Sequence, residues 1–129
     1  MNDTNNQSTL RLVLRSNAVF SGVSGLLFIF ASAAVAGFIG INSSFVILLI
    51  GVGLAGYAIL IQVNASRMEI DKTFVLSAII ADSTWVVLSI ILLVTNWVPF
   101  TVEGKWAVGI IAGIVDVFAT LQFLEWRKM

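Results

Sequence analysis

The chain has 129 residues, of which 59% are hydrophobic and only 11% charged, with seven basic and seven acidic side chains. Its mean hydropathy of +1.03 lies outside the range of soluble domains and predicts an integral membrane protein. The absence of cysteine and histidine excludes disulfides, thiolate metal sites and imidazole chemistry. We therefore expect no enzymatic activity, no cofactor, no metal site and no nucleic-acid partner.

Four apolar stretches follow one another along the chain, and each is long enough for a membrane-spanning helix of about 20 residues. They predict an all-α, four-helix transmembrane bundle with helices over residues 10–41, 44–67, 72–96 and 104–127. The polar start of the chain lacks the basic region of a secretory signal, so we expect a retained tail. Residues 1–129 are expected to form a single integral membrane domain.

Basic residues fall mainly on one side of the predicted membrane. Six of the seven flank the ends on that side: Arg11, Arg15, Arg67, Lys72, Arg127 and Lys128. Only Lys105 lies in the opposite loops, so the positive-inside rule places both termini in the cytoplasm of a multi-pass protein of the inner, cytoplasmic membrane. We expect Arg11 and Arg15 to anchor the first helix at anionic head groups, and Glu125 to be a solvated helix end.

Small residues at helical spacing indicate how the helices pack. Spacings of four residues place small side chains on one face of a helix, which lets two backbones approach closely in lipid. The packing positions expected on this basis are Gly22, Gly25, Gly51, Gly53, Gly109 and Gly113. A compact bundle follows, and its partners are expected to be the lipid bilayer and either further copies in a homo-oligomer or a larger membrane complex.

The two predicted hairpins share a faint duplication. Asn17, Phe20 and Ser24 match Asp82, Trp85 and Ser89 at an offset of 65, and Gly53, Gln62 and Arg67 match Gly113, Gln122 and Arg127 at an offset of 60. A hairpin returns to the side from which it started, so its repeat keeps the same orientation, as a parallel duplication. Chance matching is the alternative, since apolar helices share a small alphabet.

Two aspartates, Asp82 and Asp116, lie inside the third and fourth predicted helices. An ionised group in hydrocarbon costs about 2.5 to 3.5 kcal/mol, so such groups usually face a protein interior or a polar path. Pro99 lies midway between them in sequence, and at about 1.5 Å of rise per residue both fall near the middle of the membrane. Helical spacing places each on a packing face, so we expect a level pair of buried carboxyls that face each other, a cavity or a neighbouring subunit.

Three interpretations of this pair remain open. The first is a proton or cation site that serves transport or sensing in an oligomer. The second is a structural or assembly subunit in which the aspartates hydrogen-bond between helices. The third is binding of a lipid or pigment between the helices, with Tyr57 and Trp85 as aromatic lining or as simple packing. The residues proposed for the polar core are Asp82, Asp116, Gln122, Asn17, Gln62, Trp85 and Thr120.

The stretches LRLVLRSNAVFSGVSG, ADSTWV and LQFLEWR resemble uncharacterised small bacterial four-helix integral membrane proteins. The resemblance covers most of the chain and implies the four-helix fold, but no activity. Small multidrug exporters have a similar length and also four helices, but they rely on a glutamate in the first helix. This chain has no charge from residue 16 to residue 66, so we reject that assignment.

Overall fold

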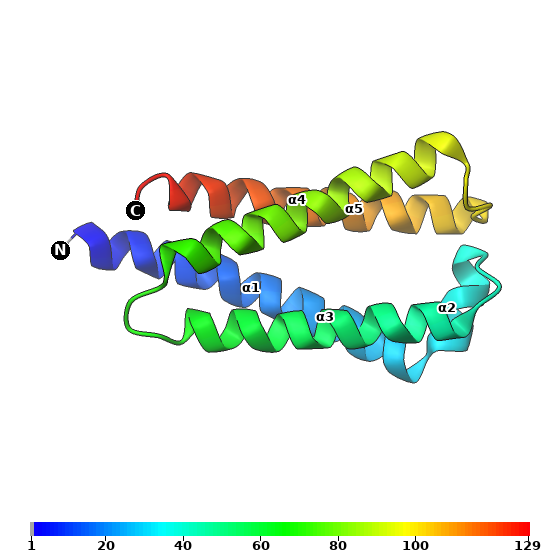
Figure 1. Ribbon diagram of the computed structural model, residues 1–129, viewed down its shortest axis with the longest axis horizontal. Helices are drawn as coiled ribbons and strands as arrows, with labels where there is room; N and C mark the ends of the chain where they lie inside the picture. The colour runs from blue at the N-terminus through cyan, green and yellow to red at the C-terminus, as the bar shows by residue number, and fades with distance from the viewer. Residues whose placement is uncertain (1) are drawn as a thin grey trace.

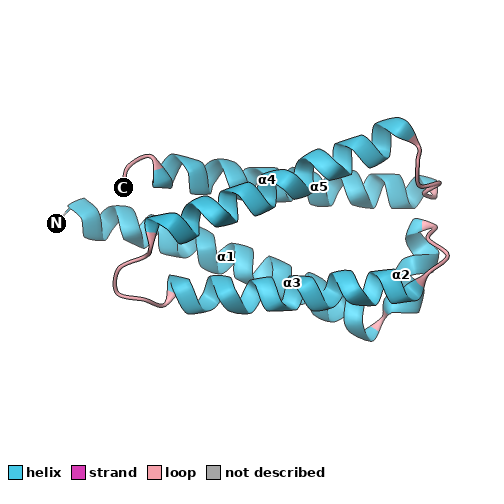
Figure 2. Cartoon of the chain, viewed as in Figure 1, coloured by secondary structure: helices cyan, strands magenta, loops and turns pink. Residues whose placement is uncertain are grey.

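The computed structural model describes residues 2–129, with side chains from residue 7 onward. Within this range all regular structure is helical (Figures 1 and 2): α1 (Asn2–Phe30), α2 (Ser32–Ile39), α3 (Ser44–Ala65), α4 (Lys72–Thr95) and α5 (Val102–Trp126). Four segments are long and apolar enough to cross a membrane: Gln7–Phe30, Ser44–Ala65, Lys72–Thr95 and Val102–Trp126. The prediction of an all-α bundle with four spanning helices is confirmed.

The prediction of one helix over residues 10–41 is wrong in two respects: the helix begins earlier, and it is interrupted before its end. α1 already begins at Asn2, because polar residues continue a helix beyond the apolar part that hydropathy detects. It ends at Phe30, and Ala31, with φ −126° and ψ 34°, separates it from α2. At about 1.5 Å per residue the segment Gln7–Phe30 already covers about 35 Å, enough to cross the hydrocarbon, so α2 is free to turn aside (Figure 1).

The end of α2 is joined to the start of α5 by Thr101. α2 ends at Ile39 and is capped by Gly40, whose φ of +90° is one that glycine adopts without strain. The Thr101 hydroxyl donates to the carbonyl of Phe38 at 2.5 Å, and its amide donates to the carbonyl of Ile39 at 3.1 Å. The same hydroxyl accepts from the amide of Gly104 at 2.9 Å and caps α5. Thr101 therefore binds free backbone groups at the C-terminal end of α2 and at the N-terminal end of α5.

The helices form two hairpins, one of α1 with α3 and one of α4 with α5. The hairpins meet where α1 packs against α5, whereas the backbones of α3 and α4 hardly approach each other. Both termini lie at one end of the bundle, which we call the terminal end (Figure 1). Figure 1 also shows the two hairpins diverging toward the opposite end.

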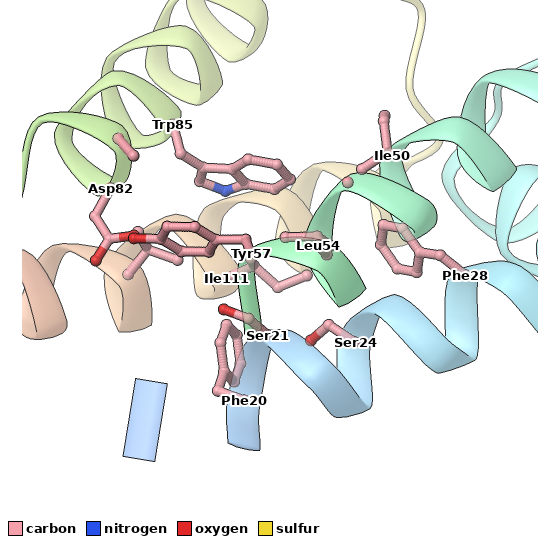
Figure 3. A pocket seen from close by; sticks show the side chains of 13 residues that line it. Phe20, Ser21, Ser24, Phe28, Ile50, Leu54, Tyr57, Asp82, Trp85 and Ile111 are labelled. Atoms are coloured by element: carbon pink, nitrogen blue, oxygen red, sulfur yellow. The ribbon is translucent and has the colours of Figure 1, made fainter. Parts of the chain in front are cut away.

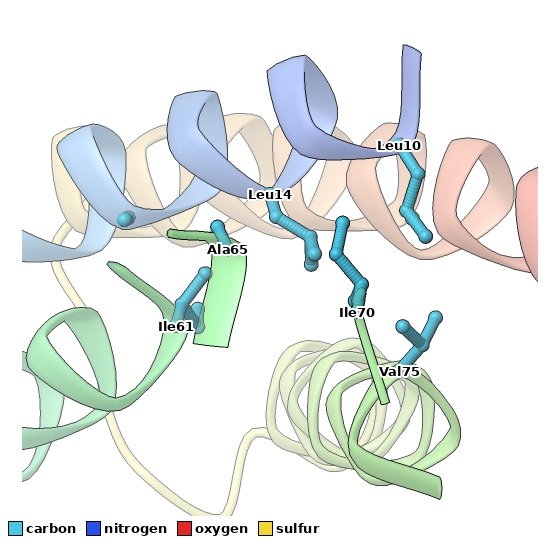
Figure 4. Packing of buried hydrophobic residues seen from close by; sticks show 7 residues of the cluster. Leu10, Leu14, Ile61, Ala65, Ile70 and Val75 are labelled. Carbon is cyan, nitrogen blue, oxygen red and sulfur yellow. The ribbon is translucent and has the colours of Figure 1, made fainter. Parts of the chain in front are cut away.

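The hydrophobic core lies at the terminal end (Figure 4). Its buried members come from α1, α3, the following turn and α4: Leu10, Leu14, Ala18, Ile61, Ala65, Ile70 and Val75. Trp126 of α5 packs against them. All four spanning helices are therefore held together tightly at this end.

Arg11 fastens the turn between α3 and α4 to α1. Its guanidinium donates to the carbonyls of Ala65 at 2.7 Å, Arg67 at 2.6 Å and Met68 at 3.2 Å. A cation is favourable here because the C-terminal carbonyls of a helix carry partial negative charge. Arg11 thus stabilises the fold in addition to any contact with head groups, whereas Arg15 is exposed.

Two glycines allow α1 and α3 to touch. A Cβ on Gly25 would lie 2.8 Å from the nitrogen of Ala55 and 2.8 Å from the oxygen of Gly51. A Cβ on Gly51 would lie 2.8 Å from the Cβ of Phe28, and one on Gly22 would make an ordinary contact at 3.4 Å. The crossing of α1 and α3 therefore requires glycine at positions 25 and 51.

The other predicted packing glycines lie at no helix contact within the described chain. A Cβ on Gly53 or Gly113 would meet nothing within 4 Å, and one on Gly109 would meet only Leu93, at 3.9 Å. The packing role of these three glycines is therefore not used within the described chain and stays a prediction for contacts with a neighbouring molecule.

We predict that Gly25→Ala lowers the free energy of unfolding by about 1 to 3 kcal/mol, because the added methyl overpacks the contact with α3. The matched control is Gly56→Ala, since a Cβ on Gly56 meets nothing within 4 Å. The control should stay within about 0.5 kcal/mol of wild type. Unfolding by SDS in mixed micelles measures both, and equal effects would contradict the assigned contact.

Arg11→Ala should lower the free energy of unfolding by about 1 to 2 kcal/mol, because three carbonyls lose a charged donor in a partly exposed place. Arg15→Ala removes the same charge from an exposed position and should change stability by less than about 0.5 kcal/mol. The same titration compares the two, and a loss no larger for Arg11→Ala than for Arg15→Ala would refute the role of Arg11.

Candidate functional site

Asp82 is the centre of a buried polar cluster, which we define as Asn17, Ser21, Tyr57, Asp82 and Gln122. Its side chain is only 5% exposed. Asn17 Nδ2 of α1 and Gln122 Nε2 of α5 each donate to Asp82 Oδ2, both at 2.9 Å. The Tyr57 hydroxyl of α3 lies 2.9 Å from Asp82 Oδ1. The three other spanning helices thus each supply one donor to a carboxyl on α4.

The two amides of the cluster are also bonded to each other. Asn17 Nδ2 donates to Gln122 Oε1 at 3.0 Å, and the Ser21 hydroxyl donates to Asn17 Oδ1 at 3.1 Å. Both hydrogens of the Asn17 amide are therefore used. Asn17 and Gln122 are 2% and 0% exposed, and in such a low-dielectric place an unpaired polar group is costly. The bonds fix the rotation of α1, α4 and α5 relative to one another.

No basic side chain takes part in the cluster. The one ion pair among residues 7–129 joins Lys128 to Glu125, and the described residues contain no group of three or more acidic side chains that could hold a metal. Asp82 is therefore held by neutral donors, and its charge is not compensated by a cation of the chain. A buried carboxyl in this state is suited to bind a proton or an external cation.

Tyr57 gives Asp82 two complete bonding arrangements. The Tyr57 hydroxyl lies 2.9 Å from Asp82 Oδ1 and 3.3 Å from the carbonyl of Ala78. When Asp82 is ionised, Tyr57 donates to Oδ1. When a proton sits on Oδ1, Asp82 can donate it to the tyrosine oxygen while the Tyr57 hydrogen turns to Ala78. Rotation of one hydroxyl therefore satisfies both protonation states.

Two adjoining cavities extend from Asp82 toward the opposite end of the bundle, and we call them together the chamber. The first has a volume of about 300 Å³ and is lined by all four spanning helices (Figure 3). The second, of about 280 Å³, shares Phe28, Ile50, Trp85 and Ile111 with the first. Asp82 is the one residue with a formal charge in either lining.

Aromatic side chains form much of the wall beside Asp82. Phe20, Phe28, Tyr57 and Trp85 all line the first cavity. The indole nitrogen of Trp85 is buried and has no hydrogen-bond partner. Figure 3 shows it on the side of the ring that faces Tyr57. The wall of the chamber therefore holds a buried donor that the described chain leaves without a partner.

Four of the predicted polar-core residues lie outside the cluster, and one of these, Trp85, lines the chamber beside it. Asp116 and Thr120 are exposed on α5, and Gln62 is exposed on α3, where it donates to the Ser66 hydroxyl at 3.4 Å. The expectation that Asp116 is buried, as Asp82 is, is therefore wrong within the described chain. Sequence spacing fixes the depth of a residue but not the rotation of its helix, and α5 turns Gln122 rather than Asp116 inward.

Three polar residues lie in the cluster or close to it although the sequence does not predict them there: Ser21, Tyr57 and Glu125. Tyr57 was interpreted as packing or lining, although it is the one tyrosine of the chain and its hydroxyl lies well inside an apolar span. Glu125 was expected to be solvated, but it is 8% exposed: Oε2 binds Lys128 at 3.1 Å, and Oε1 is buried without a partner. Its spacing of three residues from Gln122 is the signal that could have placed it on the inner face of α5.

We predict that Gln122→Leu lowers the free energy of unfolding by about 1 to 2 kcal/mol, because Asp82 loses a donor and Asn17 loses an acceptor in a buried place. Gln62→Leu changes the residue that matches Gln122 in the first hairpin, but at an exposed position. It should change stability by less than about 0.5 kcal/mol. SDS titration tests the pair, and similar losses would contradict the asymmetry of the two hairpins.

Comparison of the chain with protein-family models, with curated proteins and with solved structures finds no match. The resemblance to small bacterial four-helix membrane proteins therefore stays a prediction. What the site can do has to be argued from the polar cluster and the chamber.

Proposed function

We propose that this protein binds a hydrophobic organic cation, such as a protonated or quaternary amine, in the chamber, and that a proton competes with it for Asp82. This is a form of the proton- or cation-linked transport or sensing expected from the sequence. The observation that carries it is the position of Asp82, the single charged residue in the wall of an apolar, aromatic chamber inside the bundle.

The lining favours an organic cation over a metal ion. Ca²⁺ and Mg²⁺ need six or more oxygen ligands, counting water, and the two oxygens of Asp82 already accept three hydrogen bonds. A cationic head group instead gains from the faces of aromatic rings, here those of Phe20, Tyr57 and Trp85. The apolar remainder of the chamber suits a hydrocarbon portion, and its volume is in the range of small-molecule sites.

The second partner of Tyr57 supports exchange between a proton and the cation. With the chamber empty of ligand, a proton on Asp82 is fully hydrogen-bonded through Tyr57 and Ala78. A bound cation instead requires the ionised carboxylate. Each ligand therefore excludes the other at one carboxyl, which is the thermodynamic condition for coupling their binding.

Gln122 and Glu125 support a path for the proton to the terminal end. They lie on the inner face of α5, about 4.5 Å apart along its axis. The unpartnered Glu125 Oε1 is a free acceptor between the cluster and the exposed Lys128. In our proposal the terminal end faces the cytoplasm of a cell whose inner membrane the chain crosses, as the distribution of basic residues indicates.

A structural or assembly subunit is the second candidate, because Asp82 is completely hydrogen-bonded to three neighbouring helices. In that case the cluster only orients the helices, and no ligand is needed. The two candidates differ in whether the charge of Asp82 matters or only its hydrogen bonds.

The test is equilibrium binding of radiolabelled benzyltrimethylammonium to the full chain in lipid nanodiscs at several pH values. We expect wild type to bind and to lose affinity on acidification, because protons occupy Asp82. Asp82→Asn should weaken binding by about tenfold or more and abolish the pH dependence. Asp116→Asn, the matched change at the exposed aspartate of α5, should leave both as in wild type.

If Asp82→Asn binds the cation with the affinity and pH dependence of wild type, the proposal is contradicted. Thermal melting separates loss of charge from loss of fold, because the asparagine oxygen can still accept from Asn17 and Gln122 while its amide donates to the Tyr57 oxygen. If wild type binds no cation, Asp82→Asn melts as wild type does, and Asp82→Leu unfolds, the structural candidate is correct. Bound lipid or pigment that co-purifies with wild type and with Asp82→Asn alike would favour an uncharged ligand instead.

A further inference from the structure

The outer face of α5 carries a carboxylate that the chain itself leaves uncovered. Asp116 is exposed, and it forms no ion pair within the described chain. It lies about 15 Å along the helix from Trp126 and about 21 Å from Val102, hence deep within the spanning segment. Hydrocarbon tails offer no hydrogen bonds, and lipid head groups lie too far away, so a polar partner must reach Asp116 at that depth.

The same face carries residues suited to a close contact between helices. Gly109, Gly113, Asp116 and Thr120 follow one another at spacings of four, three and four residues, and all four are exposed. A Cβ on Gly113 would meet nothing within 4 Å, and one on Gly109 would meet only Leu93. Gly25 and Gly51 allow the close contact of α1 and α3 within the chain, whereas Gly109 and Gly113 allow no such close contact within it.

A second copy of the chain supplies what this face lacks. Copies in one membrane share their orientation, so a two-fold axis along the membrane normal places α5 parallel to α5 of the other copy. Each Asp116 then meets Asp116 of the second copy at its own depth, and Thr120 of that copy follows about one helical turn, or about 6 Å, further along the axis. A threonine hydroxyl can donate to a carboxylate, and two adjacent carboxyls can share one proton. The glycines allow the backbones to come close enough for these bonds.

We infer that Gly109, Gly113, Asp116 and Thr120 form the interface of a homodimer. The face is self-complementary, since it holds an acceptor, a donor and the small residues that both sides of a two-fold contact need. The chamber is lined by Ile111 and Val115 from the inner side of α5, so dimerisation through the outer side leaves both chambers unobstructed.

The dimer fraction is measured by energy transfer between donor- and acceptor-labelled full chains in liposomes over a series of lipid-to-protein ratios. We expect wild type to dimerise and Gly113→Leu to lower the dimer fraction at least about tenfold. Gly56→Leu is the matched control, because a Cβ on this α3 glycine also meets nothing. It should dimerise as wild type does, and so should Asp116→Asn, which keeps its hydrogen bonds.

Cross-linking gives a second readout that does not depend on the leucine variants folding. The chain has no cysteine, so Val117→Cys on the outer face of α5 should form a disulfide-linked dimer on oxidation, and Ile59→Cys on α3 should not. A monomeric wild type would overturn the inference. So would a Gly113→Leu variant that dimerises as wild type does, or cross-linking through Ile59→Cys instead of Val117→Cys.

Discussion

The hydrogen bonds to Asp82 are the interaction on which the rest of the structure depends. No hydrophobic force drives helices together in lipid, since the tails are as apolar as the side chains, so polar bonds contribute strongly to the choice of helix rotation. The polar cluster determines the rotation of each helix, because Asn17, Tyr57 and Gln122 must all point toward a single carboxyl. Once Gln122 faces inward, Asp116 faces outward. The same few bonds therefore determine which carboxylate lines the chamber and which is exposed on the outer face of α5.

The chamber lies where the two hairpins differ. In the predicted duplication α1 matches α4, and α3 matches α5, and the matched residues Asn17 and Asp82 bind each other. The packing of α1 against α5 has its counterpart in α4 against α3, but that second pair stays apart. Gln62, the match of Gln122, is exposed, and Tyr57 reaches across to Asp82 in its place. The space between α3 and α4 therefore lies where the predicted duplication would place a second contact like that of α1 with α5.

The sequence allowed the spans, their pairing into hairpins and the burial of Asp82 to be predicted, because length, hydropathy and the cost of a charge in lipid depend on local composition. Rotation about each helix depends on all four helices at once, so Asp116, Gln62 and Thr120 were placed wrongly. The break between α1 and α2 at Ala31 could not be predicted, because the sequence has no proline or adjacent glycine there. The chamber could not be predicted at all, since it arises from the separation of two helices.

The bonds of Thr101 to the end of α2 limit the routes by which the proposed ligand would reach the chamber. The hairpins are tied together by the polar cluster toward the terminal end and by Thr101 at the opposite end, so neither end of the bundle opens freely. In the proposed function, the side between α3 and α4 is the remaining way in, and it would face lipid. A solute that enters there would come from the bilayer, so its concentration in the bilayer would set how fast the chamber fills.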